Sequence, residues 1–139
     1  MLFIFGTMPA IVYLNLTING MTQVAERLVD LKKLRKIFSD NKEVMEQVMM
    51  GLILAVHDKA PALKRYYENN DWDNLEKTSR FLETSYMHVA SPELIQVIEQ
   101  LRLLVGKKER SEEIEKAISE MIYMAGYIVK DIEYYLQNL

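Results

Sequence analysis

The chain of 139 residues contains no cysteine, only two histidines, five glycines and three prolines. Without cysteine it cannot form disulfides, use a thiolate as a nucleophile or bind zinc through sulfur. This absence leaves the redox compartment undecided. Because glycine and proline are the residues that most often break regular structure, their scarcity predicts few turns and long elements. That balance favours helices over a many-stranded β fold.

The chain also lacks a large excess of charge of either sign. The formal net charge is −3 and the isoelectric point is near 5.5, so the basic surface expected of a nucleic-acid-binding protein is missing. Hydrophobic residues make up 50% of the chain and charged residues 27%, which is typical of a soluble globular domain. We therefore expect one cytoplasmic domain with no nucleic-acid partner.

The first 25 residues carry no charge at all. They lack the positive start of a secretory signal, and polar residues and Pro9 interrupt the apolar run that a membrane span needs. Three interpretations stay open: an upstream extension with Met21 as the functional start, a short element packed on the domain, or a segment that pairs with another chain as a homodimer. We divide the chain into an uncharged N-terminal extension at 1–21 and a helical domain at 22–139, and we expect no membrane association.

From residue 22 onward, apolar residues recur at the three- and four-residue spacing of amphipathic helices. A short helix in "AERLVDLKKLRKIF" precedes four longer helices, which we place at about 41–69, 71–90, 91–105 and 111–138. Because the connections are short, consecutive helices are expected to run in opposite directions. The predicted fold class is all-α, an antiparallel up-down-up-down four-helix bundle with a short N-terminal helix.

Capping residues set the predicted boundaries. Asp40 with Glu43 forms a candidate capping box at the start of the second helix, and Asp71 and Ser91 are candidate caps of the next two. Pro61 lies within the 41–69 segment and lacks an amide hydrogen, so a kink is expected there.

Sequence motifs for common active sites are missing. Neither histidine follows a glutamate by three residues, as a dimetal bundle requires, and no H-E-x-x-H, G-x-S-x-G or phosphate-binding glycine loop occurs. We predict no enzymatic activity, no metal site and no cofactor.

The segment "DWDNLEKTSRFLETSYMHVASPEL" at 71–94 resembles the histidine phosphotransfer (HPt) domain, the relay module of multistep two-component signalling. The resemblance extends over about residues 28–136, through "VDLKKLRKIFSDNKEVMEQVM" and "KAPALKRYYENNDW". The positions in register with the family pattern are Asp71, Trp72, Leu75, Leu82, Ser85, Ala90, Pro92, Glu93 and Leu94.

The resemblance fails at the reactive positions. It implies a phospho-accepting histidine where Arg80 stands, a lysine where Glu83 stands and a glycine where Thr84 stands. A guanidinium keeps its proton and has no lone pair to attack a phosphoryl group. Glu83 would repel the arriving phosphate, and Thr84 would partly fill the space that glycine leaves for the partner.

The outer face of the 71–90 helix is therefore predicted to dock without accepting phosphate. Its partner would be the receiver domain of a response regulator or a sensor-kinase component. Arg80 could enter the acidic pocket of a receiver and form two charge-assisted hydrogen bonds with a carboxylate there. Alternatively, Arg80 pairs within its own helix, with Glu83 or with Glu76. The candidate partner-binding residues share one face at i+3 and i+4 spacing: Glu76, Arg80, Glu83, Thr84, Met87 and His88.

Two other functions remain open from the sequence. The chain could be a helical interaction or assembly domain with no connection to phosphorelays. It could also be an active phosphotransfer protein that uses His57 or His88, although each has a simpler role as an ordinary polar residue on a helix.

Overall fold

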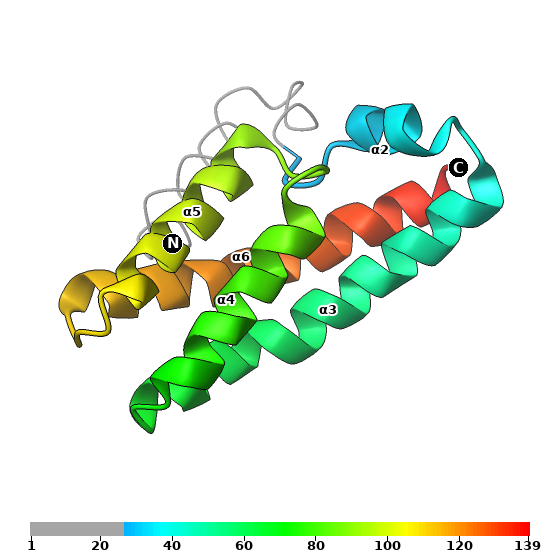
Figure 1. Ribbon diagram of the computed structural model, residues 1–139. Coiled ribbons are helices and arrows are strands. Elements are labelled where there is room, and N and C mark those ends of the chain that lie inside the picture. The colour runs from blue at the N-terminus through cyan, green and yellow to red at the C-terminus, as the bar shows by residue number, and fades with distance from the viewer. Residues whose placement is uncertain (1–26) are drawn as a thin grey trace, which may run out of the picture.

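The computed structural model describes residues 27–139, which form five helices and no strand (Figure 1). The predicted all-α class is thus confirmed for this part of the chain. The proposed extension at 1–21 and the boundary at 22 lie outside the described residues. None of the described helices is both long and apolar enough to cross a membrane. The helices are α2 (Leu31–Phe38), α3 (Lys42–Glu68), α4 (Trp72–Tyr86), α5 (Pro92–Gly106) and α6 (Glu112–Gln137).

Three of the long helices begin at side-chain caps that stand just before them. The carboxylate of Asp71 accepts from the amide of Asn74, and the hydroxyls of Ser91 and Ser111 accept from amides three residues on. The caps at Asp71 and Ser91 confirm the predicted starts of α4 and α5.

The predicted cap at Asp40 is wrong. Asp40 has a left-handed backbone with φ of 58°, and its carboxylate lies 3.6 Å from Arg35. Asn41 has the extended backbone of a capping residue, and its side-chain oxygen accepts from the amide of Val44 at 3.2 Å. The helix therefore begins one residue later than predicted, at Lys42.

Helix α4 ends at Tyr86, four residues before the predicted end at residue 90. The amides of Val89 and Ala90 both donate to the carbonyl of Tyr86, at 3.0 and 2.8 Å, which closes a turn. Beyond that turn Ala90 forms an isolated bridge with Val29, and the amide of Asp30 donates to the carbonyl of Val89 at 2.7 Å. Pairing with a distant segment ends the helix, and the local sequence does not encode that pairing.

The same pairing shortens the first helix. Leu28 and Val29 belong to the extended segment, and α2 begins only at Leu31 because the Asp30 carboxylate accepts from the amide of Lys32 at 2.9 Å. The helix predicted within "AERLVDLKKLRKIF" is therefore confirmed only in its second half.

The four long helices pack in a closed order, which is consistent with a helical bundle. Helices α4 and α6 each contact both α3 and α5, while α2 lies against α3. Pro61 lies inside α3, which is a single helix with Ala60, Ala62 and Leu63 buried. The largest fully buried side chains come from every described helix: Tyr86, Leu34, Met45, Met49, Leu63, Leu75, Leu82, Leu94, Ile98, Leu101, Ile114 and Met121.

Candidate functional site

The outer face of α4 carries part of the predicted docking surface. Arg80 is exposed, with 62% of its side chain accessible, and Thr84 on the next turn is exposed as well. Glu76 precedes Arg80 by one turn and is half-buried. These three residues lie together as the helical spacing predicted, because α4 is regular over this stretch. The guanidinium stands in solvent at the position that the HPt resemblance gives to a histidine.

Each acidic residue beside Arg80 has a cationic partner. Arg80 Nη2 lies 3.6 Å from Glu76 Oε2 in an i, i+4 pair, whereas Glu83 Oε2 accepts from Arg102 Nε of α5 at 2.9 Å. Of the two predicted intrahelical partners of Arg80, the structure therefore selects Glu76. Glu83 instead connects α4 to α5.

The last two predicted residues lie at the end of α4. Met87 is the C-terminal cap, and its backbone angles stay helical, so it continues the outer face seven residues after Arg80. His88 follows in the turn that leads to Ala90, and the prediction that His88 lies on the helix is wrong because the extended pairing at Ala90 stops α4 early. His88 instead lines an apolar groove of about 390 Å³ between α2, α3 and the end of α4. Its other lining residues are Ile37, Phe38, Val48, Leu52, Ser85 and Val89.

The second histidine lies elsewhere. His57 is on the outer side of α3, its side chain is 76% accessible, and its Nδ1 is 3.5 Å from the carboxylate of Asp58. Neither histidine therefore occupies the α4 face around Arg80.

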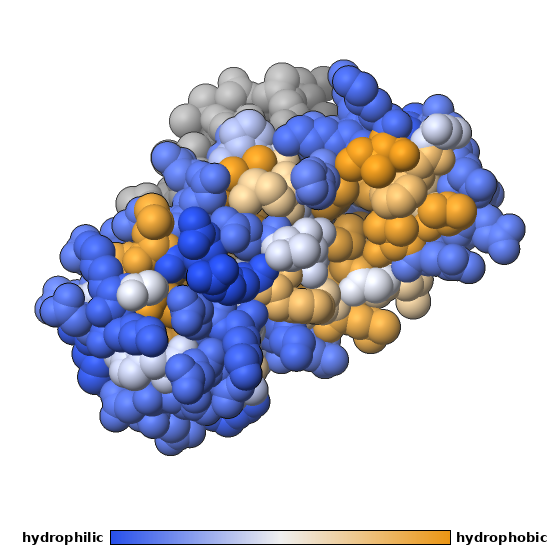
Figure 2. All heavy atoms as spheres, viewed as in Figure 1, coloured by the Kyte–Doolittle hydropathy of each residue, from blue (hydrophilic) through white to orange (hydrophobic). Residues whose placement is uncertain are grey.

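Sequence reasoning missed two residues beside this face. Phe81 is 44% exposed, and the ammonium of Lys59 lies 5.4 Å from the centroid of its ring. Figure 2 shows strongly hydrophilic surface over α4 and the facing edge of α5, and apolar surface over α3 and the adjoining ends of α2 and α4. Phe81 directly precedes the core residue Leu82, so the helical period of α4 could have predicted its place between the buried and the exposed face. The contact of Lys59 with Phe81 could not be predicted, because Lys59 is on another helix.

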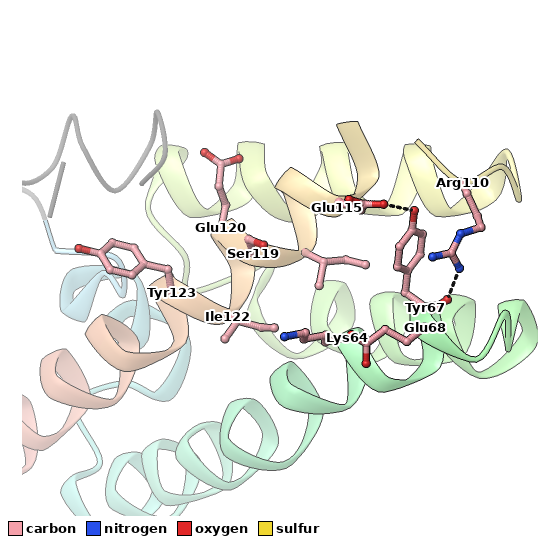
Figure 3. A pocket seen from close by; sticks show the side chains of 10 residues that line it. Lys64, Tyr67, Glu68, Arg110, Glu115, Ser119, Glu120, Ile122 and Tyr123 are labelled. Atoms are coloured by element: carbon pink, nitrogen blue, oxygen red, sulfur yellow. Dashed lines mark hydrogen bonds between the residues drawn. The ribbon is translucent and has the colours of Figure 1, made fainter. Parts of the chain in front are cut away.

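A cavity of about 730 Å³ lies at the other side of the molecule, between the C-terminal part of α3 and α6 (Figure 3). The hydroxyl of Tyr67 donates to Glu115 at 3.0 Å. Arg110 donates to the carbonyl of Tyr67 at 2.8 Å and lies 4.3 Å from the centroid of its ring. Burial, reinforced by the bond to Glu115, raises the pKa of Tyr67. These groups satisfy one another and hold the end of α3 against the start of α6.

Within residues 27–139, no three histidine, aspartate or glutamate side chains are grouped closely enough to hold a metal ion. The α4 face can offer a partner the exposed guanidinium of Arg80, the hydroxyl of Thr84 and the neighbouring ring of Phe81. Comparison with protein-family models, with curated proteins and with solved structures finds no match to this chain. Its resemblance to HPt domains accordingly stays a prediction drawn from the residues.

Proposed function

We propose that this protein is a non-catalytic, HPt-like signalling module of a two-component or phosphorelay system. It docks on a receiver-type partner, or on a sensor-kinase component, without accepting phosphate. The observation that carries the proposal is the exposed guanidinium of Arg80 on the outer face of α4, where the family pattern implies an imidazole. An arginine there preserves a charged contact point and removes the nucleophile.

The proposed fold is the antiparallel up-down-up-down bundle. Two contacts between α3 and α4 support it. The ring of Tyr67, near the end of α3, lies 6.0 Å from that of Trp72 at the start of α4. The hydroxyl of Tyr86, at the end of α4, donates to the carbonyl of Leu52 in the first half of α3. These two contacts support opposite directions for α3 and α4, and the short connections favour the same alternation for α5 and α6.

The pair between Arg80 and Glu76 is compatible with docking. Its charged atoms are 3.6 Å apart and the arginine is largely in solvent, so breaking the pair costs at most about 0.5 kcal/mol. A receiver pocket holding several carboxylates can replace that single partner with a bidentate contact. Phe81, the residue after Arg80, adds exposed apolar area beside the cation.

We expect Arg80→Glu to weaken binding to a receiver domain encoded near this gene by more than about tenfold, since a like charge would face the acidic pocket. Titration calorimetry with the receiver measures this effect. Lys116→Glu is the matched control because it makes the same charge change at an exposed position on α6, and it should leave the affinity within about twofold. Equal loss in both variants would contradict the proposed contact point.

The proposal also predicts which substitutions should restore phosphate transfer. Arg80→His with Thr84→Gly returns the nucleophile and the space, but Glu83→Lys alone would place two cations together, because Glu83 now bonds Arg102. We therefore combine these changes with Glu83→Lys and Arg102→Glu. This fourfold variant should take up acid-labile phosphate from a phosphorylated receiver. The matched control is the same variant with Ala at position 80, which should remain unlabelled.

The unmodified chain tests the alternative directly. It should take up no phosphate from phosphorylated receivers. Acid-labile phosphate on His57 or His88 would establish an active relay protein instead and would overturn the proposal.

A helical assembly domain is the second candidate, and the exposed apolar side chains of α3 favour it. Met50 and Leu54 are 51% and 60% exposed although they lie one turn apart on a long helix. An absence of receiver binding combined with tight self-association would support this second function.

A further inference from the structure

The outer side of α3 carries a continuous stripe of exposed side chains opposite the core. At 100° per residue, these positions lie within about 40° of Leu54 on the helical surface. We call the set from residue 43 to residue 65 the outer stripe: Glu43, Gln47, Met50, Leu54, Asp58, Pro61 and Arg65. Glu68, the last residue of α3, lies at the same 40° limit beyond the stripe. The core-facing residues of the same helix, such as Met49, Val56 and Leu63, lie on its other side.

The outer stripe is apolar at its centre. Met50 and Leu54 are half or more exposed, which leaves two large apolar side chains in contact with water on adjacent turns. Gly51 lies beside them, and a Cβ added to it would meet no atom within 4 Å. A glycine inside a helix weakens that helix relative to alanine, and no packing within the described residues compensates for it here. Glycine beside an apolar pair allows another helix to approach closely.

Two pairs of oppositely charged residues on α3 lie at matched or nearly matched distances on either side of this centre. Glu43 lies eleven residues before Leu54, and Arg65 lies eleven residues after it. On one shoulder of the stripe, Glu46 precedes Leu54 by eight residues and Lys64 follows it by ten. All four charged side chains are exposed, and none is in an ion pair within the described residues.

This pattern is self-complementary under a two-fold rotation. When two copies of α3 cross at Leu54 in opposite directions, Glu43 of each copy faces Arg65 of the other, and Glu46 faces Lys64. A rotation about an axis perpendicular to both helices keeps each shoulder of the stripe on its own side, so the two pairs form simultaneously. A parallel arrangement would instead place like charges together at both ends.

We propose that the outer stripe of α3 is a self-association surface, on which a second copy of this chain packs its own α3 in antiparallel orientation. Leu54 lies at the two-fold axis and contacts Leu54 of the second copy. Met50 and Gly51 flank that contact, and the pairs of Glu43 with Arg65 set the orientation. The surface is separate from the α4 face, so self-association and receiver docking are independent properties.

Sedimentation velocity of the full chain, from about 5 to about 500 μM, tests the proposal over the range expected for a small interface. The wild type should pass from monomer to dimer with rising concentration. Leu54→Glu should remain monomeric throughout, because it places two carboxylates at the axis. Leu103→Glu is the matched control: Leu103 is 59% exposed on α5, and this variant should dimerise like the wild type. A wild type that stays monomeric, or a Leu54→Glu variant that still dimerises, would overturn the proposal.

Charge reversal tests the antiparallel orientation. Glu43→Arg and Arg65→Glu should each weaken the dimer, and the double variant should restore it, since the pair is then re-formed with its signs exchanged. A double variant weaker than either single one would contradict the antiparallel arrangement.

The absence of cysteine provides a direct measurement of the contact at the axis. Leu54→Cys should form a covalent dimer on mild oxidation, because facing positions at a helix crossing come within the span of a disulfide. Leu103→Cys should not cross-link under the same conditions. Cross-linking of both variants at the same rate would indicate random collision and would contradict the proposed contact.

Discussion

Replacing Leu82 by alanine is expected to lower the free energy of unfolding by about 2–5 kcal/mol. Leu82 lies on the inner side of α4 and is fully buried, so truncation removes apolar contacts and leaves a cavity that the neighbouring helices only partly fill. Urea unfolding followed by circular dichroism measures the loss as a lower midpoint with an unchanged slope.

Phe81, the preceding residue, is the matched control for that substitution. Its ring is 44% exposed, and the ammonium of Lys59 lies 5.4 Å from the ring centroid. Phe81→Ala should therefore cost no more than about 1 kcal/mol. If both substitutions had the same effect, the orientation of α4, and with it the exposed position of Arg80, would be wrong.

Asp131→Ala is expected to cost about 3–5 kcal/mol, because it removes one partner of a largely buried ion pair. Asp131 Oδ2 accepts from the amides of Leu28 and Val29, at 2.6 and 3.4 Å, and Oδ1 accepts from Arg27 at 3.1 Å. Without the carboxylate, two amides in the buried segment at 28–29 lose their acceptor, and the segment is no longer held on α6. Asp58→Ala is the control, because Asp58 is exposed and its effect should stay within about 0.5 kcal/mol.

Asp131 should also give the stability a distinctive pH dependence. Burial raises its pKa, although the two amides and Arg27 partly oppose that shift. The folded protein then binds this proton more tightly than the unfolded chain does. The contribution of Asp131 is therefore fully present below the ordinary pKa of 3.8 and decreases as the pH rises through the folded-state value.

Comparison with Asp131→Asn isolates that contribution. The unfolding free energy of the wild type, minus that of the variant, should fall as the pH rises from 3.8 and then become constant. Chemical denaturation at a series of pH values measures the difference. A difference that rises with pH would mean that the bonds from the amides and Arg27 outweigh burial.

Much of the fold could be predicted from local sequence. Asp71 and Ser91 were identified as caps because each has a short side chain with an oxygen acceptor and stands just before an amphipathic helical segment. The apolar residues of α6 repeat at helical spacing along its whole length, so this helix was equally clear. Its predicted range of 111–138 differs from Glu112–Gln137 by one residue at each end. The N-terminal cap of α3 was misplaced by one residue because Asp40 and Asn41 are both competent caps. Only the backbone conformation of Asp40 distinguishes them.

The candidate site was predicted less completely. Glu76, Arg80 and Thr84 share a face because a regular helix fixes their relative directions. His88 does not share that face, because a contact between Ala90 and Val29, 61 positions earlier, ends α4. The partner of Glu83 is Arg102, nineteen residues away on α5, and no intrahelical spacing rule identifies such a pair.

The sequence by itself determined the helical class, most helix starts and the absence of a nucleophile at position 80. Each of these depends on a residue's own properties or on neighbours within about two turns. The tertiary structure alone decided where α2 begins and α4 ends, which acid pairs with Arg80, and how Asp131 holds the segment before α2. It also decided that the stripe on α3 faces solvent. These features join residues distant in the chain, and their free energies arise only when the helices pack.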